Sequence, residues 1–322
     1  MARKRRGKPI NGWLIIDKPL GLTSSRVVGL VKHSLDAAKA GHGGTLDPLA
    51  TGILPIALGE ATKTVSYVMD GYKEYTFTVA WGESRDSDDL EGAVTGTSPA
   101  RPEKTQILEA LKEFVGEIEQ IPPAYSAIKV EGRRAYDLAR AGEDVALKSR
   151  LVFVENITLL TIPDCDHATF SVICGKGTYI RSIARDLAQH MGCLGHVSAL
   201  RRTRVGPFTE KQAISVDSLE SLGHSAALAE HLLAVETVLD DIPALALNAD
   251  LAGALRNGQD VALFKATYLG TKTAAGYQDP SPELPENVVA GRSPVLALSG
   301  GRPVAIVRCE QGRIKPVRVF KL

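Results

Sequence analysis

The sequence has few cysteines, no long hydrophobic run and almost no net charge. Its four cysteines contain no C-x-x-C pair, which argues against a zinc site and fits a reduced, cytoplasmic compartment; they are Cys165, Cys174, Cys193 and Cys309. No apolar stretch approaches the roughly 18 residues that span a bilayer, so we expect no membrane association. The net charge of +1 gives no overall signal for a polyanionic partner, although one basic face is enough to bind one.

The patterns that are present are those of an α+β protein. Residues 73–81, KEYTFTVAW, alternate apolar and polar side chains as a half-buried strand does, and residues 169–174 predict another strand. Apolar residues recur at helical spacing over 107–118 and 180–191. Because strands and helices do not alternate regularly, we expect a mixed, largely antiparallel sheet. The acidic segment 82–92, GESRDSDDLEG, does not fit a calcium loop and predicts a solvated loop.

The composition of the chain changes near residue 240. A short helical pattern, ADLAGALRNGQDV, is followed by a Gly/Pro/Ser-rich segment at 268–294 that predicts a loop. Three short β runs then follow, joined by SGGR and EQGR, which predicts a meander. A chain of 322 residues is long enough for two domains. We therefore expect one unit at residues 1–241 and a small β-rich unit at 242–322.

A glycine-rich stretch at residues 41–63, GHGGTLDPLATGILPIALGEATK, surrounds a single carboxylate, Asp47. It matches neither a P-loop nor a dinucleotide-binding loop, because G-K-[ST] and G-x-G-x-x-G are both missing. His42 and Asp47 alone are too few ligands for a metal site. On residue types alone, the interpretation that stays open is an Asp-Pro start of a helix.

Five motifs, in order and over nearly the whole chain, resemble those of the TruB family of tRNA pseudouridine-55 synthases. They are IDKP at 16–19 with Gly21 and Ser24, the stretch 41–63, KEY at 73–75, PPAYSAIK at 122–129 with Gly132, Tyr136, Ala139, Arg140 and Gly142, and GTYIRS at 177–182. Two small departures occur, since Gly43 and Thr45 stand where the family often has Thr and Ala.

The resemblance implies an α+β pseudouridine synthase body at 1–241, with an RNA-gripping insertion at about 122–150 and a PUA-like β-barrel at 242–322. It implies isomerisation of uridine to pseudouridine at position 55 in the T-loop of tRNA. The target base is flipped out, its C1′–N1 bond is broken and a C1′–C5 bond is formed. An isomerisation needs no cofactor, and no metal is implied. The expected partner is the T-arm of tRNA, and a cytoplasmic monomer without an obligate protein partner is expected.

The resemblance also implies roles for individual residues. Asp47 is the expected nucleophile or base: it adds to C6 of the base, or assists removal of a proton from ribose C2′, and both routes stay open. Arg181 is the expected ion-pair partner, because a cation in the first helical turn opposes the helix dipole and needs an anion nearby. The implied contacts to the base are Tyr75 as a stacking ring, Tyr179 as a second ring and candidate proton relay, and Leu200 as an apolar wall, while His42 is implied to take the place that the flipped base leaves.

The resemblance also implies that basic residues contact the RNA backbone. They are Lys18, Lys63, Lys129, Arg133, Arg134, Arg140 and Arg202, with Arg201 and Arg204 in the same cluster. Such runs are often only solvated faces, but phosphate contacts predict an affinity that falls steeply with salt. The alternative is a non-catalytic RNA-binding or RNA-folding factor on the same scaffold. Only the enzyme needs Asp47 and Arg181 together.

Overall fold

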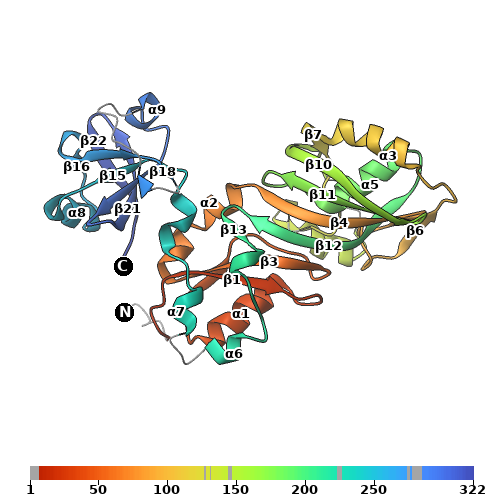
Figure 1. Cartoon of the computed structure of the whole chain (residues 1–322), viewed down its shortest axis with the longest axis horizontal. Helices are drawn as coiled ribbons and strands as arrows, with labels where there is room; N and C mark the ends of the chain where they lie inside the picture. Colours follow the sequence, from red (N-terminus) through yellow and green to blue (C-terminus); the bar gives the residue numbers. More distant parts are fainter. Residues whose placement is uncertain are drawn as a thin grey trace.

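A computed structural model describes residues 7–126, 128–130, 132–143, 147–222, 227–273, 276–277 and 285–322 of the chain. Within these ranges, a ten-stranded sheet forms the larger body, and a six-stranded sheet forms a smaller unit at one end of it (Figure 1). None of the helices in these ranges is long and apolar enough to cross a membrane.

The large sheet is mixed and largely antiparallel, as predicted. Its strands follow the order β14 (Ile214–Ser215), β1 (Gly12–Lys18), β3 (Ala50–Leu58), β12 (Gly195–Val205), β4 (Lys73–Trp81), β11 (His167–Cys174), β10 (Arg150–Asp164) and β7 (Gly116–Gln120), with β2 (Ala40–His42) on β3 and β13 (Phe208–Thr209) on β12. Only the β1–β14 and β12–β3 pairs are parallel. The strands predicted at 73–81 and 169–174 are therefore confirmed as β4 and β11.

Helix α5 (Ile180–His190) covers one face of this sheet, as its apolar spacing predicted. Its buried Ile183 and Leu187 share a core with Phe77 of β4 and with Ile107 of α3 (Lys104–Ala110). Smaller helices complete the body: α1 (Ser24–Ser34), α2 (Val65–Asp70), α4 (Ala135–Arg140), α6 (Leu219–Leu222) and α7 (Ala227–His231). The arrangement leaves the N-terminal turn of α5 free to supply side chains to a site.

The helix predicted over 107–118 is too long. Helix α3 is followed by the 3-10 helix η2 (Leu111–Phe114), and Gly116 then adopts a φ of +92°, which only glycine adopts readily. Ile118 belongs to β7, where it pairs with Val152 of β10. The apolar period continues by chance across a glycine that ends the helix.

The smaller unit is a curled sheet with the predicted meander. Its strand order is β16 (Val261–Ala262), β22 (Arg313–Val319), β21 (Arg302–Glu310), β20 (Val295–Ser299), β15 (Ala244–Ala246) and β17 (Thr267–Gly270). Helix α8 (Ala249–Arg256) lies where the helical pattern predicted it. Side chains of this unit, including Leu296 and Phe320, share a core with Trp13 and Phe208 of the body. The predicted boundary at 241/242 stays a prediction.

The segment 268–294 was expected to be a loop, and this is only partly correct. It contains most of β17, the short hairpin β18 (Lys272–Thr273) and β19 (Gly276–Tyr277), and the one-turn helix α9 (Glu286–Val289). Two-residue strands leave too little periodicity to be found in a Gly/Pro-rich sequence. Residues 274–275 and 278–284 lie outside the described part of the chain.

Candidate active site

Three of the predicted site residues line one pocket in the body. Asp47 comes from the loop between β2 and β3, Arg181 from the first turn of α5, and Leu200 from β12. The other residues that line this pocket are Leu49, Ala50, Asp89, Leu90, Val197, Ser198 and Ala199. A carboxylate, a guanidinium and an apolar wall, all far apart in sequence, therefore meet at one place.

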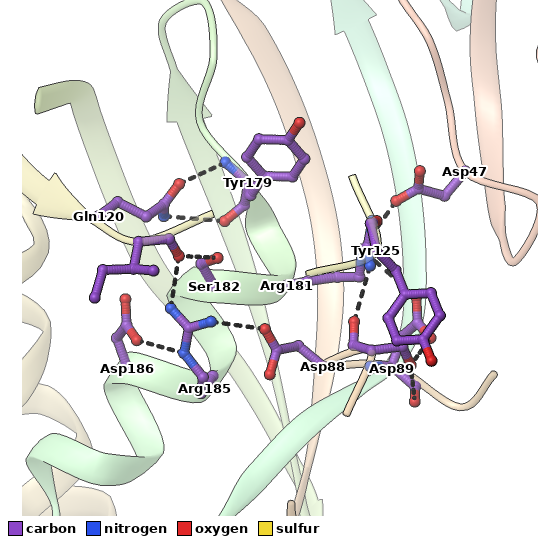
Figure 2. Close-up of polar contacts among 12 residues, drawn as sticks. Asp47, Asp88, Asp89, Gln120, Tyr125, Tyr179, Arg181, Ser182, Arg185 and Asp186 are labelled. Carbon is purple, nitrogen blue, oxygen red and sulfur yellow. Dashed lines mark hydrogen bonds and ion pairs between the residues drawn. The ribbon is translucent and has the colours of Figure 1, made fainter. Parts of the chain in front are cut away.

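Arg181 is the centre of the polar contacts in this pocket. Its side chain is buried, and its Nε lies 3.0 Å from Oδ2 of Asp47 and 3.5 Å from Oδ2 of Asp89 (Figure 2). Nη1 donates a hydrogen bond of 2.8 Å to the Ser87 carbonyl, and Nη2 donates one of 2.9 Å to the Tyr125 carbonyl. Two carbonyls thus fix the guanidinium while its Nε faces two carboxylates, and this arrangement compensates a charge that is costly to bury.

Arg202 holds the glycine-rich loop that carries Asp47 by donating hydrogen bonds to its backbone. It is 1% exposed, and its guanidinium donates to the carbonyls of Ile53 (2.8 Å), Thr45 (3.1 Å) and Gly44 (3.1 Å). Gly52 is required for this close approach, because a Cβ there would lie 2.2 Å from the Arg202 carbonyl oxygen. The burial of Arg202 argues against its predicted contact with RNA phosphate and gives it a bracing role instead.

Two further side chains hold the same loop next to Asp47. The buried Ser24 hydroxyl donates to the Leu46 carbonyl (2.9 Å) and accepts from the Leu46 amide (2.8 Å). The fully buried Lys18 donates through Nζ to the Pro48 carbonyl at 3.3 Å. Burial lowers the pKa of Lys18 to about 8, against the opposing effect of Asp47. Lys18 therefore also braces the loop, and its burial argues against the predicted phosphate contact.

The acidic segment 82–92 was predicted to be a solvated loop, and this is only partly correct: Asp86, Leu90 and Glu91 are exposed, but Glu83–Arg85 form the short strand β5 and the centre of the segment is buried. Ser87, Asp88 and Asp89 are all buried, and Asp89 forms a bridge to Val197 of β12 that brings its carboxylate into the pocket. Behind it, Oδ2 of Asp88 lies 2.8 Å from Nη1 of Arg185. One feature of the sequence indicates these partners: Arg181 and Arg185 lie four residues apart, on one face of the helix, and both need acids.

Comparison with known proteins places the chain in a family. The model described as "TruB family pseudouridylate synthase (N terminal domain)" matches residues 32–180, and "tRNA pseudouridylate synthase B C-terminal domain" matches residues 181–240. Relatives named tRNA pseudouridine synthase B from Rhodospirillum rubrum and Caulobacter vibrioides are 52% and 49% identical, each over 100% of both chains. The chain belongs to the TruB family of pseudouridylate synthases. The predicted family and enzyme class are confirmed.

Solved structures confirm the fold of this TruB family member. A chain from the crystal structure of a Cbf5-Nop10-Gar1 complex is 27% identical, with a TM-score of 0.69, over 96% of this chain and 84% of that one. A chain of the archaeal box H/ACA sRNP Nop10-Cbf5 complex, 22% identical, shares the fold with a TM-score of 0.70, over 99% of this chain and 92% of that one. The curled C-terminal sheet fits the predicted PUA-like module.

Tyr75 and His42 lie near the braced loop but not in the lining of the TruB pocket. Tyr75 of β4 is half-buried, pairs in register with Arg202, and packs with Leu200 against both neighbouring cores. Burial raises the pKa of its phenol, and Arg202 opposes this. Nδ1 of His42 is buried without a hydrogen-bond partner in the described residues, and burial followed by Arg202 lowers the pKa of its imidazole. The stacking of a base on Tyr75 and the entry of His42 into the place that the base leaves both stay predictions.

Tyr179 is held by its backbone at the start of α5. Gln120 of β7 accepts from the Tyr179 amide (2.8 Å) and donates to its carbonyl (3.1 Å), as Figure 2 shows. The guanidinium of Arg150 lies 5.0 Å from the centre of the Tyr179 ring, which is a cation–π contact. The ring is outside the pocket lining, and its contact to the base stays a prediction. The predictions did not include Gln120, and no pattern in the sequence marks it.

Other predicted RNA-contacting cations lie nearer the surface. Arg133 forms a two-pronged ion pair with Glu143 (2.9 and 3.1 Å), and Arg140 is exposed at the end of α4. Lys63 donates to the Val319 carbonyl (2.7 Å) of the C-terminal unit. The side chains of Lys129 and Arg134 lie outside the part that the structure describes. Their contacts with phosphate stay predictions.

Two neighbouring cations are already paired within the chain. Arg201 lies 2.8 Å from Asp17 and 2.6 Å from Glu210, and Arg204 lies 3.3 Å from Glu74. Their positive charge is therefore largely balanced at this surface, and a phosphate would have to compete with these carboxylates.

Proposed function

We propose that this enzyme converts uridine to pseudouridine at position 55 in the T-loop of tRNA, with Asp47 as nucleophile or base. The observation that carries the proposal is the 3.0 Å ion pair between Asp47 and the buried Arg181 in a pocket lined by Leu200. The relatives' name, tRNA pseudouridine synthase B, supports tRNA as the substrate. The resemblance of the five motifs supports the T-loop position.

The proposed reaction is an exchange of glycosidic bonds without net redox change. The C1′–N1 bond breaks, a C1′–C5 bond forms, C5 loses its proton, and N1 gains one. Asp47 either adds to C6 of the base and is expelled again when C5 loses its proton and the C5=C6 double bond is restored, or assists removal of the C2′ proton to give a glycal. Both routes need a carboxylate that stays ionised and fixed, and the two carbonyls that hold Arg181 provide a fixed counter-charge.

The target base must leave its stack before reaction, which costs a few kcal/mol. Stacking on Tyr75, worth roughly 1–3 kcal/mol, offsets part of this cost, and Leu200 forms an apolar wall under the base. Tyr179 is the candidate proton relay at C5, and His42 takes the place that the base leaves.

We propose that phosphate contacts come from surface cations: Lys63, Lys129, Arg133, Arg134 and Arg140. The insertion at 122–150 and the PUA-like unit at 242–322 then hold the T-arm.

The test is to incubate wild-type enzyme and the Asp47→Asn variant with unmodified tRNA, and to map pseudouridine by carbodiimide-dependent stops of reverse transcription. The wild type should give a stop at the T-loop uridine, and Asp47→Asn should give none while still binding tRNA. Asp164→Asn, which removes an exposed carboxylate at the β10–β11 turn, is the matched control and should act as the wild type does.

Two results would contradict the proposal. A wild-type enzyme that binds tRNA but forms no product would favour an RNA-folding factor. A stop at a different uridine would show that the enzyme class is right and the T-loop position is wrong.

A further inference from the structure

A second arginine–carboxylate pair lies behind the pocket and does not line it. Arg185 places Nη1 2.8 Å from Oδ2 of Asp88, and its Nη2 donates to the Ile121 carbonyl at 2.8 Å (Figure 2). Its Nε lies 2.8 Å from the carboxylate of Asp186, its neighbour on α5. Arg185 therefore connects the acidic segment 82–92, which we call the acidic loop, to Ile121. This residue follows β7 and precedes the insertion at about 122–150, and we call it the insertion root.

Asp88 stands between the two residues of the acidic loop that contact Arg181. The carbonyl of Ser87 accepts from Arg181, and the carboxylate of Asp89 faces the same guanidinium. The carbonyl of Asp88 itself accepts from the amide of Val197 at 3.0 Å, and its φ is +60°. The backbone at Asp88 thus takes a left-handed turn that its side chain anchors, and the orientation of both neighbours depends on that anchor.

We propose that the Asp88–Arg185 ion pair is a positioning element for the reaction, which holds Ser87 and Asp89 so that Arg181 faces Asp47. The inference rests on the proposed role of Asp47. The Ser182 hydroxyl also donates to the Ile121 carbonyl (2.9 Å), and Arg181 itself donates to the Tyr125 carbonyl. Three side chains from the first turns of α5 therefore hold the insertion root and the acidic loop in one rigid arrangement.

Asp88, the acid of this ion pair, titrates in a pH range where turnover can be measured. Burial raises the pKa of Asp88 to about 6, with Arg185 and then Arg181 opposing this and Asp186 adding to it. The loop of Asp88 also carries Glu83, Arg85, Asp86, Asp89 and Glu91, and on β12 His196 precedes Val197, whose amide donates to the Asp88 carbonyl. As the pH falls through about 6, Asp88 takes up a proton and its ion pair with Arg185 weakens. Turnover should fall in the same range.

The same shift has the opposite effect on stability. Because the pKa of Asp88 is higher in the folded chain than its ordinary value of 3.8, the folded chain binds this proton more tightly than the unfolded chain does. The contribution of Asp88 to the free energy of unfolding therefore increases as the pH falls from about 6 toward 4. A loss of turnover through Asp88 near pH 6 is thus not caused by unfolding.

The variants are Asp88→Asn, Arg185→Gln and their double. Asn is chosen because it tolerates a positive φ as Asp does, so the backbone turn is kept. Each single variant should lower kcat about tenfold or more through misalignment, with KM within about twofold. The double variant should be no worse than the singles. Asp186→Asn, which removes the other carboxylate on Arg185 without touching the acidic loop, is the matched control and should keep kcat within about twofold.

The pH profile separates positioning from a merely structural role. The wild type should lose kcat as the pH falls through about 6, and Asp88→Asn should show no such loss, at an unchanged Tm to within about 3 °C. Wild-type kcat in Asp88→Asn, an unchanged acid limb, or a fall in kcat that follows a large fall in Tm would each overturn the inference. If Asp47→Asn also kept wild-type turnover, the proposed function itself would fail; if only Asp88→Asn did, only this inference would.

Discussion

Two loops supply carboxylates to the same guanidinium, and they are held in opposite ways. The loop before β3 places Asp47 at Arg181 and is braced by buried cations that donate to its backbone carbonyls, Arg202 and Lys18. The acidic loop places Asp89 there and is held by its own carboxylate, Asp88, on the cation Arg185. The loop before β3 is rich in glycine and is held by side chains from other elements. The acidic loop is held by a side chain of its own, Asp88.

This difference explains why one loop is recognisable in the sequence. The loop before β3 needs small residues because side chains from other elements approach its backbone closely, so its glycines and its Asp-Pro pair are conspicuous in the sequence. A loop that anchors itself is only a run of acids, which has the composition of a solvated surface. Variants at Arg181, Arg202, Lys18 and Arg140 should differ in their effects, which are expected to decrease in this order.

Removing the shared cation should have the largest effect. Arg181→Met leaves two facing carboxylates, Asp47 and Asp89, without their counter-charge, so turnover should fall below detection. The affinity for tRNA should stay within a few fold, because Arg181 is buried and cannot contact phosphate. Turnover is measured by pseudouridine formation and affinity by filter binding. Normal activity in Arg181→Met would remove this residue from the mechanism.

Removing the brace of the first loop should mainly cost stability. Arg202→Gln breaks up to three charge-assisted hydrogen bonds to carbonyls, so the free energy of unfolding in urea should fall by about 2–4 kcal/mol. The salt dependence of tRNA affinity should not change, because Arg202 is buried. A smaller salt slope at wild-type stability would mean that Arg202 contacts phosphate, as the sequence suggested.

Lys18, the second cation that holds the loop before β3, should affect how the free energy of unfolding depends on pH. The folded chain binds the Lys18 proton less tightly than the unfolded chain, since burial lowers the pKa from 10.5 to about 8. The free energy of unfolding should therefore gain from Lys18 as the pH rises from about 8 to 10, by up to about 1.4 kcal/mol per pH unit. The gain should be absent from Lys18→Met in matched urea titrations. An identical slope in both proteins would argue against a buried, charged Lys18.

The smallest effect is expected at an exposed cation of the insertion. Arg140→Gln should leave stability unchanged, because the side chain is exposed. It should lower tRNA affinity a few fold and reduce the slope of log affinity against log salt by about 1. The measurement is a binding titration between about 50 and 200 mM salt. A salt slope equal to that of the wild type would exclude a phosphate contact at Arg140.

Much of the fold and the first loop could be predicted from the sequence, and physical reasons limit the rest. Strand β4 and helix α5 have clear periods because each buries one face against the core. Asp47 and Arg181 could be paired from the family motifs and from a cation placed against a helix dipole. By contrast, the buried positions of Asp88 and Arg202 depend on the tertiary contacts of β12 and α5, and charge alone indicates a surface position.

The most direct test compares the two carboxylates on the shared guanidinium in one measurement. Tritium placed at C5 of the target uridine is released when the new bond to C5 replaces it, so single-turnover release from a T-arm RNA reports the exchange itself. We predict full release by the wild type, slower but measurable release by Asp89→Asn, and none by Asp47→Asn at equal RNA occupancy. Release by Asp47→Asn at the wild-type rate would contradict the account.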